Sequence, residues 1–126
     1  MREKEVIKIP SITLEWDDWY HWDDIKKDVK NGGIEIPKTQ GVYEVSKNKK
    51  ETLTIGKASD LRKRIRRGLV KGKIPHSAGE KIRQRENVSE IFIRWAVTNR
   101  PAAVEEELHR RYMEKFGKFP KYVKHT

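Results

Sequence analysis

Cysteine is absent from this 126-residue sequence, and methionine occurs only twice. Without cysteine the chain forms no disulfides, no thiolate zinc sites and no thiol nucleophiles. The four histidines (His21, His76, His109 and His125) are scattered along the chain without the spacing of metal ligands. The composition therefore argues against a structural zinc site.

Long apolar stretches are missing as well. No segment approaches the roughly 20 apolar residues that a membrane-spanning helix needs. Residues 1–10 alternate charged and apolar side chains instead of presenting the apolar run of a signal peptide. We therefore expect a cytoplasmic protein without membrane contacts. Because internal repeats and low-complexity linkers are also lacking, we expect residues 1–126 to form one domain.

Charge is abundant and unevenly distributed. The formal net charge is +10, yet residues 1–40 hold 7 basic and 9 acidic side chains, so the excess of cations belongs to the remainder of the chain. Seven cations lie between Arg62 and Lys73, a density that suits a polyanion bound with release of counterions. A solvated, heat-adapted surface is the alternative. The predicted nucleic-acid-binding residues are Arg62, Lys63, Arg66, Arg67, Lys71 and Lys73.

The hydropathy pattern predicts an α+β fold with three strands. The expected strands cover residues 40–46, 51–56 and 90–97, and the first two form a hairpin through a polar turn. A helix capped by Ser59 should follow the hairpin and bury a stripe made of Leu61, Ile65 and Leu69. The last helix should begin at Pro101, end at Gly117 and bury Val104, Leu108, Tyr112 and Phe116.

Residues 1–36 differ in kind from the rest and are expected to be an accessory segment, with the core in residues 37–123. Trp16, Trp19 and Trp22 recur every three residues, which favours a single packing face that covers the edge of the sheet. A helix through Ile25 and Val29 should end near residues 31–33. The alternative, a stacking platform for bases, is opposed by four neighbouring aspartates that repel phosphate.

One carboxylate of the last predicted helix is placed for chemistry. Glu105, Glu106 and Glu107 are consecutive, but only Glu105 falls within the arc of the apolar stripe when residues are spaced by about 100°. A carboxylate on that face needs a cation or donors. A salt bridge to an arginine and a metal-ligand role both satisfy this requirement.

Tyr43 and Lys57 lie on the two strands of the predicted hairpin, which could bring their side chains together. A lysine beside a tyrosyl hydroxyl would favour the phenolate, a better proton acceptor. Taken alone, a tyrosine such as Tyr43 is more often a half-buried strand aromatic than a catalyst. Arg64 flanks the Leu61/Ile65 stripe, and taken alone its side chain is expected only to bind phosphate or water.

In their order, these segments resemble the GIY-YIG nuclease superfamily. The likeness runs from residue 37 to about residue 123 and is carried by residues 41–43 (GVY), 54–64 (TIGKASDLRKR), 103–109 (AVEEELH) and 117–122 (GKFPKY). The family positions for a second tyrosine and for a later asparagine are occupied by Thr54 and Val123.

The resemblance implies a small three-stranded antiparallel sheet flanked by helices, and hydrolysis of DNA phosphodiesters with one Mg²⁺ or Mn²⁺. It assigns the metal to Glu105, the attacking water to Tyr43, support of that tyrosine to Lys57 and the phosphate charge to Arg64. A metal and an arginine supply the charge neutralisation that such chemistry requires.

Thr54 and Val123 support a second hypothesis, a catalytically weakened nuclease relative that only binds nucleic acid, because threonine cannot act as a phenolate base. A basic RNA- or ribosome-associated protein is a third. No separate recognition domain is apparent, so DNA shape, a homodimer or a partner protein would choose the substrate.

Overall fold

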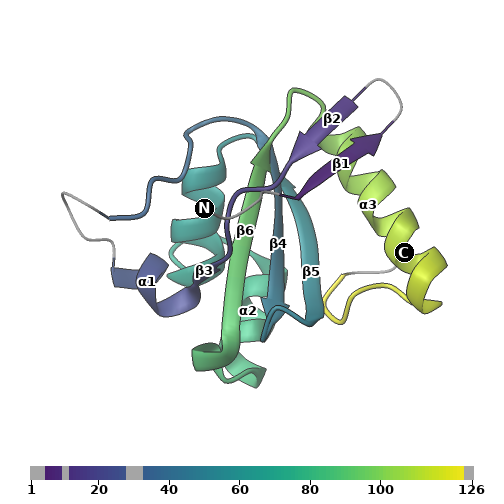
Figure 1. The fold of residues 1–126 in the computed structure, drawn as a ribbon. Helices are drawn as coiled ribbons and strands as arrows, with labels where there is room; N and C mark the ends of the chain where they lie inside the picture. Colours follow the sequence, from purple (N-terminus) through teal and green to yellow (C-terminus); the bar gives the residue numbers. More distant parts are fainter. Residues whose placement is uncertain (1–4, 10–11, 28–32, 124–126) are drawn as a thin grey trace.

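The structure, a computed structural model, describes residues 5–9, 12–27 and 33–123 and has an α+β architecture. Its strands are β1 (Val6–Ile9), β2 (Ile12–Glu15), β3 (Tyr20–His21), β4 (Gly41–Lys47), β5 (Glu51–Ala58) and β6 (Ile91–Val97). Its helices are α1 (Trp22–Lys27), the wide π-type helix η1 (Lys63–Val70), α2 (Ser77–Arg85), the short 3₁₀ turn η2 (Val88–Glu90) and α3 (Pro101–Phe116). Figure 1 shows these elements grouped around one central sheet.

The central sheet has four antiparallel strands in the order β3-β6-β4-β5, beside a separate two-stranded β1-β2 hairpin. The prediction of a three-stranded sheet is therefore wrong. The three expected strands are present, but Tyr20 and His21 add a fourth by pairing with Ile93 and Phe92 of β6. The sequence conceals this strand because two residues are too few for an alternating pattern.

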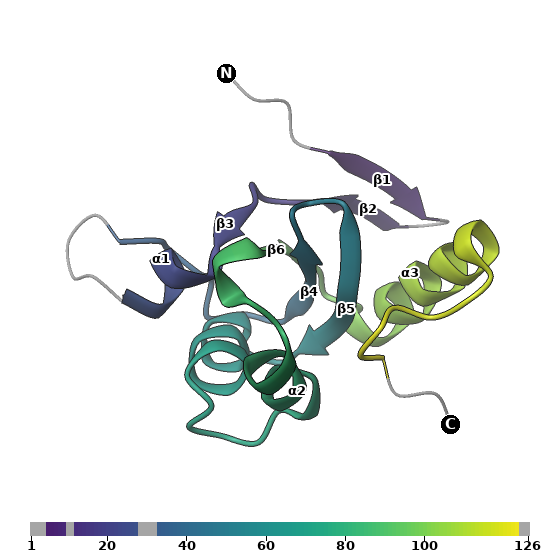
Figure 2. The ribbon, with the colours of Figure 1, turned by 90° about the horizontal axis from the view of Figure 1, so that it is seen from below.

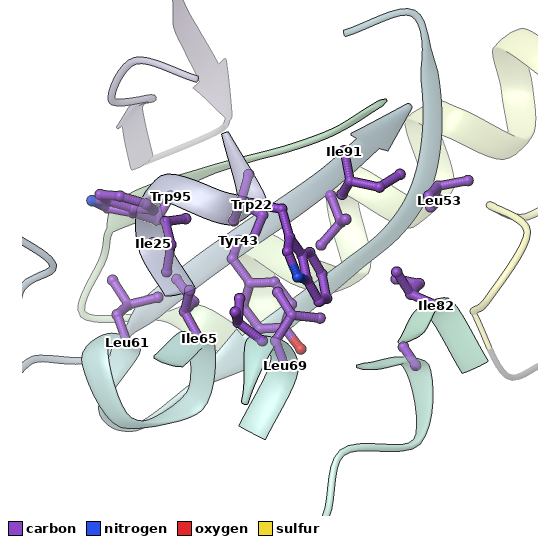
Figure 3. Close-up of a cluster of buried hydrophobic side chains, with 14 of the residues drawn as sticks. Trp22, Ile25, Tyr43, Leu53, Leu61, Ile65, Leu69, Ile82, Ile91 and Trp95 are labelled. Carbon is purple, nitrogen blue, oxygen red and sulfur yellow. The ribbon is translucent and has the colours of Figure 1, made fainter. Parts of the chain in front are cut away.

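Two apolar clusters cover the two faces of the sheet. The first lies under η1, α1 and α2 and includes Tyr43, Val45, Leu61, Ile65, Leu69 and Trp95; Figure 3 shows how the side chains of these helices meet those of the strands. The second lies under α3 and the β1-β2 hairpin and includes Leu14, Trp16, Val42, Ile55, Val104 and Leu108. Figure 2 shows the hairpin and α3 on the side of the sheet away from α2.

The predicted helices are present with three differences. Asp60, not Ser59, caps the first of them, because its Oδ1 accepts the Lys63 backbone N–H at 3.0 Å. In α3, Phe116 is 50% exposed although it shares the apolar stripe, because α3 extends beyond the second core there. The sequence pattern also missed α2, which is short, polar and interrupted by Gly79.

The N-terminal segment is part of the fold rather than a cover for it. Trp22 joins the first core and Trp16 the second, so the predicted common face of the tryptophans is wrong. The guanidinium of Arg94 lies between the rings of Trp16 and Trp19, 4.4 and 4.5 Å from their centroids. Its Nη2 is 2.7 Å from the Glu44 carboxylate, so this segment is held by cation–π and ionic contacts. Val29 and the predicted stop at residues 31–32 lie outside the described residues.

None of the helices in the described ranges is long and apolar enough to cross a bilayer.

Replacing Arg94 with alanine should destabilise the fold by about 3–5 kcal/mol, because Glu44, 8% exposed, would lose its cation within a buried pair. The free energy of unfolding in urea measures the loss. Arg110→Ala is the matched control, since its pairs with Glu107 and Glu114 are exposed, and its midpoint should stay close to that of the parent. Equal midpoints for the two variants would show that the Arg94 contacts do not hold the segment.

Candidate active site

The candidate site lies at the β5 edge of the sheet, where Tyr43 reaches across Gly56. The two residues are direct partners in the β4-β5 ladder. A Cβ atom on Gly56 would lie 2.3 Å from the Tyr43 hydroxyl oxygen, so only glycine leaves room for this course of the ring. The tyrosine is 2% exposed, and its hydroxyl is thereby brought to the edge strand.

His76 is the hydrogen-bond partner of Tyr43. Its Nε2 lies 2.8 Å from the Tyr43 Oη, and the bond is buried. The other ring nitrogen, Nδ1, accepts the backbone N–H of Gly79 at 3.0 Å and so caps α2. Because Nδ1 accepts, the neutral ring carries its proton on Nε2 and donates it to the tyrosine.

Arg64 acts on the same hydroxyl. Its guanidinium lowers the pKa of Tyr43 through its charge and as a side-chain hydrogen-bond donor. The arginine is itself held by the Pro75 carbonyl, which accepts from Nη1 at 3.2 Å, and it lines a cavity of about 160 Å³ with Ser59, Asp60 and Lys63. Its Nε is buried and has no acceptor among the described residues.

The electrostatics keep both rings neutral at pH 7. Burial raises the pKa of Tyr43, Arg64 opposes that shift, and the charge of Glu105 adds to it. Burial also lowers the pKa of His76 to about 4, assisted by the positive charges of Arg64 and Arg83. The phenol and the imidazole are therefore both uncharged, with two donors directed at the Tyr43 oxygen.

Lys57 does not lie beside Tyr43 across the hairpin, contrary to the sequence-based expectation. Its ladder partner is Val42, whose side chain belongs to the second core, whereas Tyr43 belongs to the first. Neighbouring strand residues point to opposite faces, so Lys57 starts on the α3 side of the sheet. The side chains that act on the Tyr43 hydroxyl are those of His76 and Arg64, not that of Lys57, to which the resemblance assigns the support of this tyrosine.

Glu105 completes the site from α3. It lines a cavity of about 620 Å³ together with Lys57, and it is near enough to Tyr43 for its charge to raise the tyrosine pKa. Within the described part of the chain, it forms no hydrogen bond and no ion pair, so the salt bridge that would explain it structurally is not present there. Arg64 and His76 thus act directly on the Tyr43 hydroxyl, whereas Glu105 acts on it only through its charge and shares its cavity with Lys57 on the α3 side.

The side chains at this edge fit one hydrated divalent cation rather than an enclosed metal site. In the described ranges, no group of three or more His, Asp or Glu side chains could enclose a metal ion. Glu105 provides one half-buried carboxylate that forms no ion pair with any residue the structure describes, beside an open cavity. Mg²⁺ keeps several waters and takes its remaining ligands from one or two carboxylates and from substrate phosphates, which this arrangement permits.

The predicted nucleic-acid-binding residues divide into two groups. Arg62 and Arg66 donate to the carbonyls of Ile36 and Ile34 and tie the segment before β4 to η1. Lys63 and Arg67 are exposed, and a cavity of about 420 Å³ is lined by Lys38, Asp60, Arg62, Lys63, Arg66, Arg67 and Lys71. Lys73 is exposed but does not line this cavity. The cavity shares Asp60 and Lys63 with the smaller one at Arg64, so positive charge continues from η1 to the site.

Thr54, which occupies the position of a second tyrosine, is 4% exposed and faces Val45 inside the sheet. Its hydroxyl is not part of the site. Val123 follows Tyr122, whose hydroxyl donates to Glu86 at 2.5 Å and anchors the end of the chain to α2. Neither residue contributes to the cluster at Tyr43.

The sequence did not single out His76 as a partner of Tyr43, because no helix was expected to follow this residue. A usable signal was present: Ser77 and Glu80 have the spacing of a helix start, and Ile82 follows at an apolar position. Recognising α2 would have placed His76 at a helix cap, next to the hairpin.

In comparisons with known proteins, no family model, no curated protein and no solved structure matches the chain.

The buried His76 should make stability depend on pH. Its folded-state pKa of about 4 lies below the ordinary 6.5, so the unfolded chain binds the extra proton between these values. The neutral, buried His76 therefore contributes on the order of 3 kcal/mol to the free energy of unfolding. This contribution is complete above pH 6.5 and is lost as the pH falls towards 4. Urea unfolding from pH 4 to 7.5 measures it.

His76→Asn provides the control, because asparagine also caps a helix but does not titrate. As the pH falls, the free energy of unfolding should decrease more for the parent than for the variant. A gap that is independent of pH would mean that His76 titrates normally in the folded protein.

Proposed function

We propose that the protein is a metal-dependent endonuclease that hydrolyses DNA phosphodiester bonds. The observation that carries this proposal is the buried hydrogen bond between Tyr43 and His76 beside the edge strand β5, together with the charges of Arg64 and Glu105 that act on the tyrosine hydroxyl. In-line attack of water on a phosphodiester gains from a proton acceptor, a cation at the phosphate and a metal ligand, and the Tyr43 phenol, the Arg64 guanidinium and the Glu105 carboxylate can fill these roles. The family resemblance of the sequence points the same way.

Tyr43 is the proton acceptor in this proposal. His76 and Arg64 both donate towards its oxygen, so they stabilise the negative charge that forms when the phenol loses its proton. As the phenolate, Tyr43 accepts a proton from the attacking water and directs the water at phosphorus. Because burial raises its pKa, the phenolate is scarce at neutral pH, and cleavage should accelerate as the pH rises.

Arg64 and Lys57 neutralise the substrate from the two sides of β5. Arg64 is fixed by Pro75, so its guanidinium needs no reorganisation when a phosphate arrives. Lys57 is exposed and forms no ion pair with any residue that the structure describes, so its ammonium is available to a phosphoryl oxygen. A Mg²⁺ or Mn²⁺ ion held by Glu105 would act as a Lewis acid on the developing oxyanion.

DNA is the proposed substrate because the cationic surface is continuous with the site. The η1 cavity places six cationic side chains around one carboxylate, Asp60, and Lys63 lines both this cavity and the one at Arg64. A polymer with regularly spaced phosphates fills both, whereas a mononucleotide fills one. Binding without hydrolysis is the second candidate, and the buried Thr54 favours it because it leaves the site with a single phenol.

Purified protein should nick supercoiled plasmid with Mg²⁺ and lose this activity in EDTA. Glu105→Gln should slow nicking at least about 100-fold, and Tyr43→Phe should do the same and abolish the rise of rate with pH. Agarose gels over time give both rates.

Glu80→Gln removes an exposed carboxylate from α2, outside the site, and should nick at the parental rate. A parent protein that binds plasmid but never nicks it with any divalent metal would leave the binding module as the function. Equal nicking by Glu105→Gln and the parent would refute the metal assignment.

The Lys38→Ala/Arg67→Ala double variant should bind a DNA duplex more weakly at every sequence. Each lost phosphate contact lowers the slope of log K against log salt by about 1, so the expected reduction is about 2. Fluorescence anisotropy in EDTA from 50 to 300 mM salt measures it, independently of cleavage. Lys8→Ala/Lys26→Ala removes two exposed lysines from the acidic N-terminal part and should keep the parental slope. Identical slopes for both double variants would exclude the η1 cavity from DNA binding.

A further inference from the structure

The cavity beside Glu105 differs in chemistry from the cationic cavity on η1. Its lining is made by β5, α3 and the segment that follows α3: Lys57, Ala102, Glu105, Glu106, His109, Arg110, Met113, Glu114 and Phe119. At about 620 Å³ it is within the range of small-molecule sites. Three carboxylates make most of this lining unfavourable for phosphate.

The walls of this cavity suit a flat, largely apolar group with polar edges. Met113 and Phe119 supply apolar surface, and the Phe119 ring is fixed by an edge contact with His109 at 6.1 Å between centroids. His109 is itself anchored, because its Nε2 donates to the Ile55 carbonyl of β5 at 2.8 Å. The aromatic wall is therefore positioned in advance.

The polar groups of the cavity differ in whether another side chain already pairs with them. Arg110 is already paired with Glu107 and Glu114. Glu106 is exposed on the cavity side and forms no ion pair with any residue in the described ranges, so its carboxylate can accept from amino or ring N–H groups. A nucleobase presents both a face for Phe119 and N–H donors for Glu106.

We propose that this cavity receives one unpaired nucleobase next to the scissile phosphate. The inference rests on the proposed function, because Lys57 and Glu105 line the same cavity: the Lys57 ammonium, and a metal ion held by Glu105, would bind the scissile phosphate at its mouth. The DNA strand crosses the edge of β5 with its phosphates on the η1 side and this base on the α3 side. Figure 2 shows α3 and the η1–α2 region on opposite sides of that strand.

A paired base is excluded from such a cavity because it is stacked inside the duplex. Extracting it costs a few kcal/mol, and the cost is least where the nucleotide is already unpaired. The preferred substrate is therefore DNA with a single-stranded flap, loop or frayed end at the cleavage position, rather than an intact duplex.

The test uses three DNAs (a blunt duplex, a flapped duplex and a single strand) that share one labelled strand. Its 2-aminopurine stands at the nucleotide that is the first unpaired one in the flapped DNA. Binding is measured in Ca²⁺ by the fluorescence of 2-aminopurine, and cleavage separately in Mg²⁺. The parent should cleave the flapped DNA at least about tenfold faster than the blunt duplex. Binding of the flapped DNA should change the 2-aminopurine signal.

Phe119→Leu keeps apolar volume but removes the aromatic face, and Met113→Ala removes a second apolar side chain from the lining. Each should abolish both the substrate preference and the fluorescence change, while Phe116→Ala should keep them, since that ring is exposed and lies outside the cavity lining. Folding of all three is checked by circular dichroism.

The base site and the proposed hydrolysis are contradicted by different outcomes. A Phe119-dependent fluorescence change without any cleavage upholds the base site and overturns the proposed hydrolysis. Cleavage of blunt and flapped DNA at equal rates, with Phe119→Leu and Phe116→Ala alike in fluorescence, upholds hydrolysis and overturns the base site.

Discussion

The hydrogen bond between Tyr43 and His76 is the interaction on which the rest of the site depends. It joins the central strand β4 to the start of α2 and crosses the edge strand where Gly56 leaves space for the tyrosine ring. The bond also determines the tautomer of His76, since the same ring caps α2 through Nδ1. His76 thus caps α2 and donates a hydrogen bond to the Tyr43 hydroxyl oxygen.

The two sides of the central sheet carry different kinds of side chains. Cations gather on the side of η1, where the carbonyls of Ile34 and Ile36 hold two arginine side chains in place. The α3 side carries the apolar side chains of Met113 and Phe119 and the carboxylates of Glu105 and Glu106, which form no ion pair with the residues that the structure describes. The proposed reaction belongs at β5, the one strand of the central sheet between these environments, because phosphate charge and metal charge must meet there.

Much of this architecture was predictable from the sequence, because alternating and fourfold apolar patterns specify β4, β5, β6 and α3 directly. Helix periodicity predicted the half-buried position of Glu105 but not that of Glu107, which is half-buried as well. The position of Lys57 was not predicted, since a one-residue difference in strand register reverses the face of a side chain. The partners of Tyr43 were likewise unpredictable without α2, whose stability comes from tertiary contacts of Ile82 and His76 rather than from propensity.

The most direct test of a common site is a Mn²⁺ titration of ¹⁵N-labelled protein, followed by paramagnetic broadening of amide signals. The account predicts that Glu105 and its neighbours on α3 broaden first, together with Gly56 and Lys57 on β5, and that Glu105→Gln removes the effect. Broadening confined to the acidic stretch around Asp17, Asp18, Asp23 and Asp24, and unchanged in Glu105→Gln, would contradict a metal site at the edge of the sheet.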